Sequence, residues 1–172
     1  MLVPIGAVDK TILEALGPPL EEIFAQRTQI GDSITLPWGS WNERRGQHLV
    51  SSLLAELPSL PHLTDRVLGM VDVDVFAPGL NFVFGQADIT RKRALISLQR
   101  LRQEFYCLPR DENLFRERVL KEAVHELGHT YGLGHCPAPT CVMHFSNSLH
   151  DTDVKDWNFC PQCQEKVSRK YS

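Results

Sequence analysis

Residues 125–135 read HELGHTYGLGH, and this stretch decides which fold the chain is expected to adopt. His125 and His129 are four residues apart, so on a helix both imidazoles project from one face and can reach one ion. Gly132 lets the chain turn sharply, and His135 returns three residues later as a third ligand. Three neutral nitrogen ligands leave the fourth tetrahedral position open for water, which distinguishes a catalytic zinc site from a structural one.

Glu126 adds an acid–base group to this set. It follows His125 directly, near enough on the helix surface to contact a water at the open position. The alternative is a helix whose solvated histidines fall in register by chance, and a bare HExxH often arises in that way. Here the glycine and the third histidine also occur at the required offsets. His48, His62 and His150 lack such a pattern and are expected to be ordinary surface or core histidines.

The same stretch is expected to lie on one long helix. Asp111 can cap its first turn, and Gly132 or Gly134 can end it in the left-handed conformation. Apolar residues recur between these points at three- to five-residue spacing and predict the inward face of the helix. They are Phe115, Val119, Val124, Leu127 and Tyr131.

Upstream of this helix, strand and helix patterns alternate. Apolar, β-branched runs predict strands at residues 2–8, 33–36, 66–72, 81–85 and 93–98. Helical spacing predicts helices at 11–24, broken or restarted at Gly17-Pro18-Pro19, and at 47–57. Mostly irregular chain is expected after residue 131. No repeat or linker divides the sequence, so we expect one α+β domain over residues 1–172.

Four of the five cysteines gather near the C-terminus as two pairs, Cys136 with Cys141 and Cys160 with Cys163. Two such pairs suit a tetrahedral zinc site with four sulfur ligands, the second pair lying on a tight loop. Two disulfides or a redox-active CxxC are the alternatives. A reducing compartment disfavours the disulfides, and Cys160 does not follow the βα unit that is typical of a redox motif. Cys107 lies apart and is expected to be a small buried residue.

Composition and charge exclude several classes of protein. The 172 residues carry a formal net charge of -3 and no run of Lys or Arg, so nucleic acid is not an expected partner. The N-terminus has no basic segment followed by a long apolar run, which argues against a signal peptide. Asp72 and Asp74 interrupt the apolar stretch 67–84, which excludes a membrane span there. We therefore expect a cytoplasmic protein.

The extended motif HExxHxxGxxH is the zinc signature of the metzincin metalloproteases. This chain continues with Cys136-x4-Cys141-x-Met143 and then Cys160-x-x-Cys163, and in that combination it resembles the archaemetzincins (archaelysins). Residues 71–87 are also similar to that family, so the resemblance is specific over 71–163 and weaker over 1–70.

The resemblance implies a single metzincin-like α+β domain. Its N-terminal subdomain, residues 1–132, would hold a mixed twisted sheet, a backing helix and the active-site helix. Its C-terminal subdomain, residues 133–172, would be irregular and pinned by a zinc ion on Cys136, Cys141, Cys160 and Cys163. Met143 would form a Met-turn beneath the catalytic zinc without binding it.

The function that follows is zinc-dependent hydrolysis of peptide bonds in a peptide or protein substrate by a monomer with two zinc ions. Glu126 would be the general base and then the general acid. The edge strand that holds the substrate would comprise Asn81, Phe82, Val83, Phe84 and Gly85. Candidates for the donor that stabilises the oxyanion are Tyr131, His144 and His150.

Two other functions stay open at this stage. One is a zinc-binding or interaction module that keeps the site without cleaving peptides, and the other is a different zinc-dependent amide hydrolase. The pair Asp72 and Asp74 is also open, since alternate carboxylates on a strand either form a polar sheet face or bind a cation or an amine.

Overall fold

A mixed four-stranded sheet forms the centre of the computed structural model, which describes residues 1–60, 62 and 65–169. In spatial order its strands are β1 (Leu2–Ile5), β4 (Val67–Val71), β7 (Arg93–Ser97) and β6 (Gly85–Asp88). The first three are parallel, and β6 is antiparallel to β7 at the edge, where Gly85 pairs with Ile96. The last three residues of the expected C-terminal subdomain lie outside the described part of the chain.

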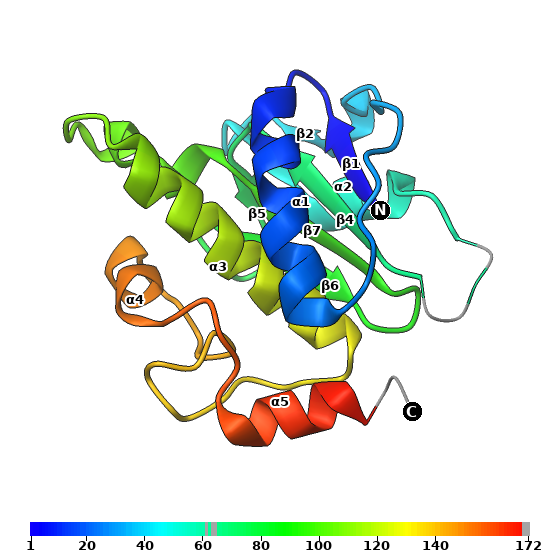
Figure 1. Cartoon of the computed structure of the whole chain (residues 1–172). Coiled ribbons are helices and arrows are strands. Elements are labelled where there is room, and N and C mark those ends of the chain that lie inside the picture. The colour runs from blue at the N-terminus through cyan, green and yellow to red at the C-terminus, as the bar shows by residue number, and fades with distance from the viewer. Residues whose placement is uncertain (61, 63–64, 170–172) are drawn as a thin grey trace.

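Helices cover both faces of this sheet. On one face, α1 (Lys10–Phe24) and α3 (Glu112–Thr130) lie side by side, as Figure 1 shows, and enclose the larger apolar cluster. On the other face, α2 (Val50–Glu56) encloses a second cluster. Every residue of β1, β4 and β7 is buried, as expected for parallel strands between two helical layers. The edge strand β6 is only half buried, which leaves it accessible beside α3.

A small second sheet and three short 3₁₀ turns complete this part of the fold. The sheet contains β2 (Trp41–Asn42), β3 (Gln47–Leu49) and β5 (Val75–Phe76). The turns are η1 (Trp38–Ser40), η2 (Gln99–Leu101) and η3 (Gln103–Tyr106). The predicted α+β class with a mixed sheet, a backing helix and an active-site helix is confirmed, as are strands near 66–72 and 93–98.

The predicted break in the first helix is wrong, because α1 continues through Pro18 and Pro19. Each proline removes one helical N–H donor, so the carbonyls of Glu14 and Ala15 lose their partners. Both of these residues are exposed, so water can solvate their carbonyls, while buried Leu20 and other apolar residues hold the opposite face of α1 in the core.

Three other predicted boundaries are also wrong. The segment 33–36 contributes a single bridge, from Ile34 to Ile5, instead of a strand. The segment 47–57 begins as β3 and becomes helical only at Val50. In the segment 81–85 only the last residue is in a strand. The Val83 N–H donates to the carbonyl of Val75 in the other sheet, so the backbone passes between the sheets before β6 begins.

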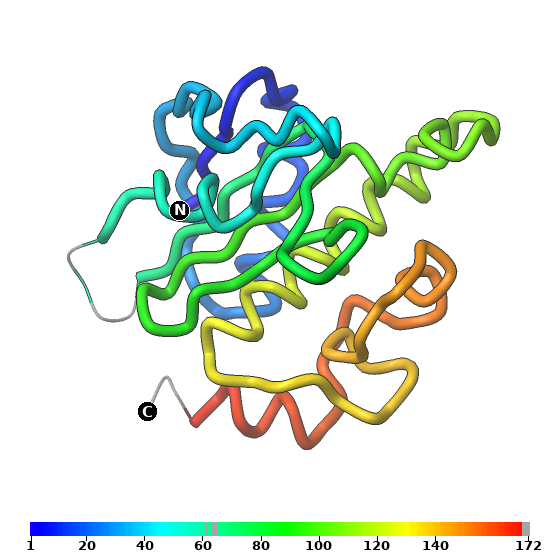
Figure 2. Tube along the Cα trace, turned by 180° about the vertical axis from the view of Figure 1, so that it is seen from behind, coloured from blue at the N-terminus to red at the C-terminus, as the bar shows by residue number. Residues whose placement is uncertain are grey.

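The chain after α3 is more regular than expected. It contains α4 (Leu149–Val154) and α5 (Pro161–Ser168), and Figure 2 shows it folding back past the active-site helix. A capping box of Ser148 and Asp151 begins α4. Cys160 is the N-cap of α5 and Pro161 its first residue, so the CxxC lies at a helix start and not on a tight loop. Among the described residues, no helix is long and apolar enough to cross a membrane.

Candidate active site and metal centres

Three histidines converge at the C-terminal end of α3. The ligand nitrogens of His125, His129 and His135 lie within 4.8 Å of one another, and the Nε2 atoms of the first two are 3.1 Å apart. Gly132, which has a φ of 83°, turns the chain just past the helix and so brings the third ring back. Ligands about 2.0–2.1 Å from one tetrahedral zinc would be about 3.3 Å apart, so the arrangement fits such an ion.

Backbone carbonyls set the orientation of the first two rings. His125 Nδ1 donates to the carbonyl of Val142, and His129 Nδ1 donates to the carbonyl of Leu133, each at 2.8 Å. A carbonyl only accepts, so each ring carries its proton on Nδ1 and presents the lone pair of Nε2 to the shared point. Burial lowers the pKa of all three rings, that of His125 to about 3, which favours the neutral, metal-binding form.

His135 is the most exposed of the three histidines. Its ring lies parallel to that of His125, with the centroids 5.4 Å apart, and Phe145 packs against it at 4.7 Å. Phe145 is itself exposed and stands at the mouth of the site. It was not predicted from the sequence, since its contact with His135 depends on the turn between them.

The carboxyl group of Glu126 is buried beside the first histidine. The backbone of β6 passes so close that a Cβ atom on Gly85 would stand 2.6 Å from Glu126 Cγ and 2.8 Å from Oε1. Burial raises the pKa of Glu126 well above its ordinary value, the charge of Glu122 raises it further, and Lys155 opposes both. A dication held by the histidines would also favour the ionised form.

A cleft of about 770 Å³ opens over these groups, between β6 with its preceding loop and α3. All five residues predicted to hold substrate, Asn81, Phe82, Val83, Phe84 and Gly85, line it. Glu122 also lines it and was missed, although its place three residues before His125 was a signal. Of the described residues that line the cleft, none is an oxyanion candidate named above.

The four clustered cysteines also converge, on the C-terminal side of His135. Their sulfur atoms lie within 4.8 Å of one another, Cys136 and Cys160 being 3.8 Å apart, and none forms a disulfide. Sulfurs about 2.3 Å from one tetrahedral zinc would be about 3.8 Å apart. The backbone amide of Cys163 and the neighbouring thiols lower the pKa of Cys160 to about 7, which favours the thiolate that binds metal.

Met143 is fully buried where the Met-turn was predicted. Its sulfur packs against Gly128 so closely that a Cβ atom on that residue would collide with it. Gly128 lies between the two helical histidines, so the thioether contacts the helix beneath them.

Several residues singled out in the sequence lie elsewhere. Asp72 pairs with Arg102 at 2.5 Å and Asp74 with Arg100 at 2.6 Å, so both carboxylates already have cationic partners. Cys107 is exposed, contrary to prediction, because it ends η3, a surface turn that buries none of its residues.

The remaining histidines are not part of the cluster. His48 is buried and its Nδ1 lies 2.7 Å from the Ser40 hydroxyl, while His62 and His150 are exposed. His144 donates from Nδ1 to the carbonyl of Cys136 at 3.0 Å.

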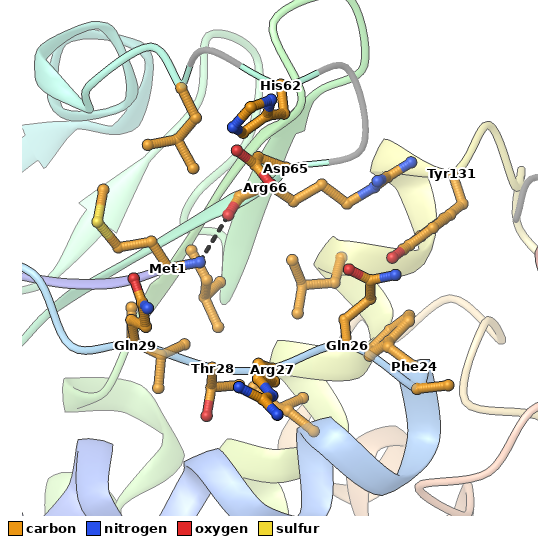
Figure 3. Close-up of a pocket in the computed structure, with 16 residues that line it drawn as sticks. Met1, Phe24, Gln26, Arg27, Thr28, Gln29, His62, Asp65, Arg66 and Tyr131 are labelled. Atoms are coloured by element: carbon orange, nitrogen blue, oxygen red, sulfur yellow. Dashed lines mark hydrogen bonds between the residues drawn. The ribbon is translucent and has the colours of Figure 1, made fainter.

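Tyr131 packs against α1 and does not line the cleft that contains the three histidines. It stacks on Phe24 with the ring centroids 5.2 Å apart, and the Arg66 guanidinium lies over the Tyr131 ring, 3.4 Å from its centroid. These residues border a second cavity of about 710 Å³, shown in Figure 3, whose rim carries the exposed side chains of Gln26 and Arg27. Tyr131 is therefore poorly placed to act at the histidine cluster.

Comparison with known proteins agrees with this geometry over almost the whole chain. A family model described as Peptidase family M54 matches residues 23–169. The archaemetzincin of Methanocaldococcus jannaschii is 48% identical over 164 residues, which cover 95% of this chain and 89% of that protein.

Two solved structures are similar in both sequence and fold. The archaemetzincin of Archaeoglobus fulgidus, complexed with malonate, is 36% identical with a TM-score of 0.84, covering 96% of this chain and 98% of that one. The archaemetzincin of Methanopyrus kandleri is 39% identical with a TM-score of 0.84, covering 99% of this chain and 95% of that one.

Proposed function

This chain belongs to peptidase family M54, the archaemetzincins, and is a zinc metallopeptidase, and from this we propose the roles of its site residues. His125, His129 and His135 hold the catalytic zinc, and Glu126 is the general base. The observation that carries the proposal is the convergence of three histidine nitrogens on one point in the cleft. The neutral rings and their carbonyl partners support it further.

The chemistry divides between the metal and the chain. Zinc bound there lowers the pKa of a bound water towards about 7 and polarises the scissile carbonyl. Glu126 accepts the proton of the attacking water and then donates it to the leaving amine. Burial of its carboxyl beside Gly85 holds this group at one place and keeps bulk water from it.

We infer that the substrate binds in extended form along β6. This strand ends the sheet, so the backbone groups on its outer edge face the cleft and can pair with a peptide. The binding strand is then Gly85–Asp88, and the loop residues Asn81 to Phe84 contact substrate side chains. Apolar Phe82 and Phe145 both line the cleft.

A second zinc ion at Cys136, Cys141, Cys160 and Cys163 completes the proposal. Four sulfur ligands leave no open position, so this ion is structural. It joins the start of α5 to the turn after His135 and so holds the C-terminal segment near the catalytic histidines.

Two substitutions test the catalytic assignment. Glu126→Ala should keep both zinc ions and the fold but lower kcat by about 10²–10⁴-fold, because the placed base is lost. His129→Ala removes a ligand instead, so zinc content and activity should fall together. The assay measures cleavage of a mixed peptide library together with zinc content. Full cleavage by Glu126→Ala would refute the assigned base, and no cleavage by the zinc-loaded unaltered protein would favour a non-proteolytic role.

A further inference from the structure

A buried ion pair lies directly behind the catalytic residues. Lys155 Nζ is 2.8 Å from Glu122 Oε1, and the two side chains are 0% and 3% exposed. Thr152 Oγ1 donates to the same carboxylate oxygen at 3.3 Å. Taking two charges out of water is costly, and replacing such a pair by apolar residues often leaves stability unchanged or higher. Folding alone therefore does not account for this pair.

The pair connects the catalytic turn of α3 to the C-terminal segment. Glu122 precedes His125 by three residues and Glu126 by four, so all three share one helix face, and all three line the cleft. Lys155 comes directly after α4, which contacts α3.

From Lys155 a short series of backbone hydrogen bonds leads to a catalytic ring. The next residue, Asp156, donates its N–H to the carbonyl of Thr140 at 2.9 Å, and Asn158 accepts from the N–H of Val142 at 3.0 Å. The carbonyl of Val142 then accepts from His125 Nδ1. Two backbone hydrogen bonds and the His125 contact thus connect the segment that follows Lys155 to the histidine ring.

We propose that Glu122 and Lys155 are positioning residues that hold the Val142 carbonyl in register with α3 and thereby orient the His125 ring for metal binding and hydrolysis. The inference rests on the proposed function of the histidine site. Its structural basis is the path from the ion pair through Asp156 and Val142 to the ring.

A neighbouring ion pair supplies a matched control. Arg118 lies four residues before Glu122 on the same helix and pairs with Asp153 at 2.6 and 2.7 Å, on the same C-terminal segment. It too joins α3 to α4, but neither residue lines the cleft. A general loss of packing between the two segments would affect both pairs, whereas a positioning role is specific to Glu122 and Lys155.

The experiment compares Glu122→Gln with Asp153→Asn, since each removes one buried or half-buried negative charge with little change of shape. We expect Glu122→Gln to lower kcat at least tenfold with less than a twofold change in KM. It should also weaken metal binding at the histidine site, measured by competition with a chelator, by about 10–100-fold, as loss of supporting contacts around a metal ligand does. Asp153→Asn should lower Tm but leave kcat and histidine-site affinity within twofold.

The double variant Glu122→Leu with Lys155→Met guards against simple misfolding, because it leaves no unpaired charge inside the protein. It should match the unaltered protein in Tm while kcat and histidine-site affinity stay low, and cobalt(II) in the histidine site should give an altered absorption spectrum. Recovery of kcat and affinity in the double variant, or equal losses in Asp153→Asn, would overturn the inference. Because metal affinity is measured without substrate, failure of this inference is distinguishable from failure of the proposed peptidase chemistry.

Discussion

At the scale of single residues, Gly128 illustrates how a missing side chain shapes the site. It lies on α3 between His125 and His129, and the Met143 sulfur fills the space that a Cβ atom would need. Phe159 Cε1 would also lie 3.2 Å from such an atom. The thioether can therefore press against the helix backbone directly beneath the two imidazoles.

Met143→Leu tests whether this sulfur packs or binds metal. The exchange nearly conserves volume, so it should cost less than about 1.5 kcal/mol in the free energy of unfolding and leave zinc at the histidine site. Urea unfolding and zinc analysis measure the two quantities. Loss of histidine-site zinc without unfolding would instead assign the sulfur as a ligand.

His125 should make the protein without histidine-site metal sensitive to acid. Burial lowers its folded-state pKa to about 3, whereas an unfolded histidine titrates near 6.5. Between these values the unfolded chain binds a proton that the folded chain does not, so stability falls as the pH drops below about 6.5. Urea unfolding at pH 7 and pH 5 should show a larger loss for the unaltered protein than for His125→Gln. Equal losses would mean that other groups govern acid sensitivity.

At the scale of elements, α5 contacts the rest of the protein through its first turn and through Val167 near its end. Cys160 is its N-cap and Cys163 lies in that turn, while Val167 is its other buried residue. So short a helix has little stability of its own, and we expect the cysteine cluster to hold its start in place while Val167 packs in the core. A cluster of four cysteines can thus keep α5 ordered although few apolar residues lie near the C-terminus.

Cys160→Ser should therefore release α5 and lower Tm, because structural zinc contributes folding free energy directly. Faster amide hydrogen exchange in residues 160–168 would report the release. Cys107→Ser is the control: this thiol is exposed and outside the cluster, so neither Tm nor exchange should change. If Cys160→Ser behaves like the control, the cysteine cluster does not carry a structural ion.

At the scale of the whole molecule, the histidine and cysteine clusters proposed to bind zinc lie next to each other in the chain. His135 and Cys136 are adjacent in the sequence, and the Cys136 N–H donates to the Met143 carbonyl. The helix that carries His125 and His129 and the C-terminal segment thus meet at a point where members of both proposed metal sites are neighbours.

Native mass spectrometry tests the overall composition proposed here. Protein purified under reducing conditions should appear as one chain with two zinc ions. Chelation should remove the ion with three nitrogen ligands first, since its open position admits a competitor and a four-sulfur site does not. One ion per chain with the clustered cysteines oxidised would contradict the second centre, and a dimer would contradict the expected monomer.

Local spacing made the histidine and cysteine clusters and the helix of the first two histidines predictable. The histidine pair depends only on the 3.6-residue period, the third histidine on a glycine turn, and the cysteine cluster on two short pairs. The buried strands 67–71 and 93–97 were equally clear, because a strand covered on both faces is apolar throughout. The family resemblance, carried by these same residues, proved correct over nearly the whole chain.

Three features were decided only by the tertiary structure, because they depend on contacts between residues far apart in the chain. Core packing keeps α1 intact through Pro18 and Pro19, although its local sequence predicts a break. Pairing with β7 starts the edge strand at Gly85, because a strand at a sheet edge takes its bounds from its neighbour. The ion pair between Glu122 and Lys155 joins two residues far apart in the sequence, so no local sequence pattern could have indicated it.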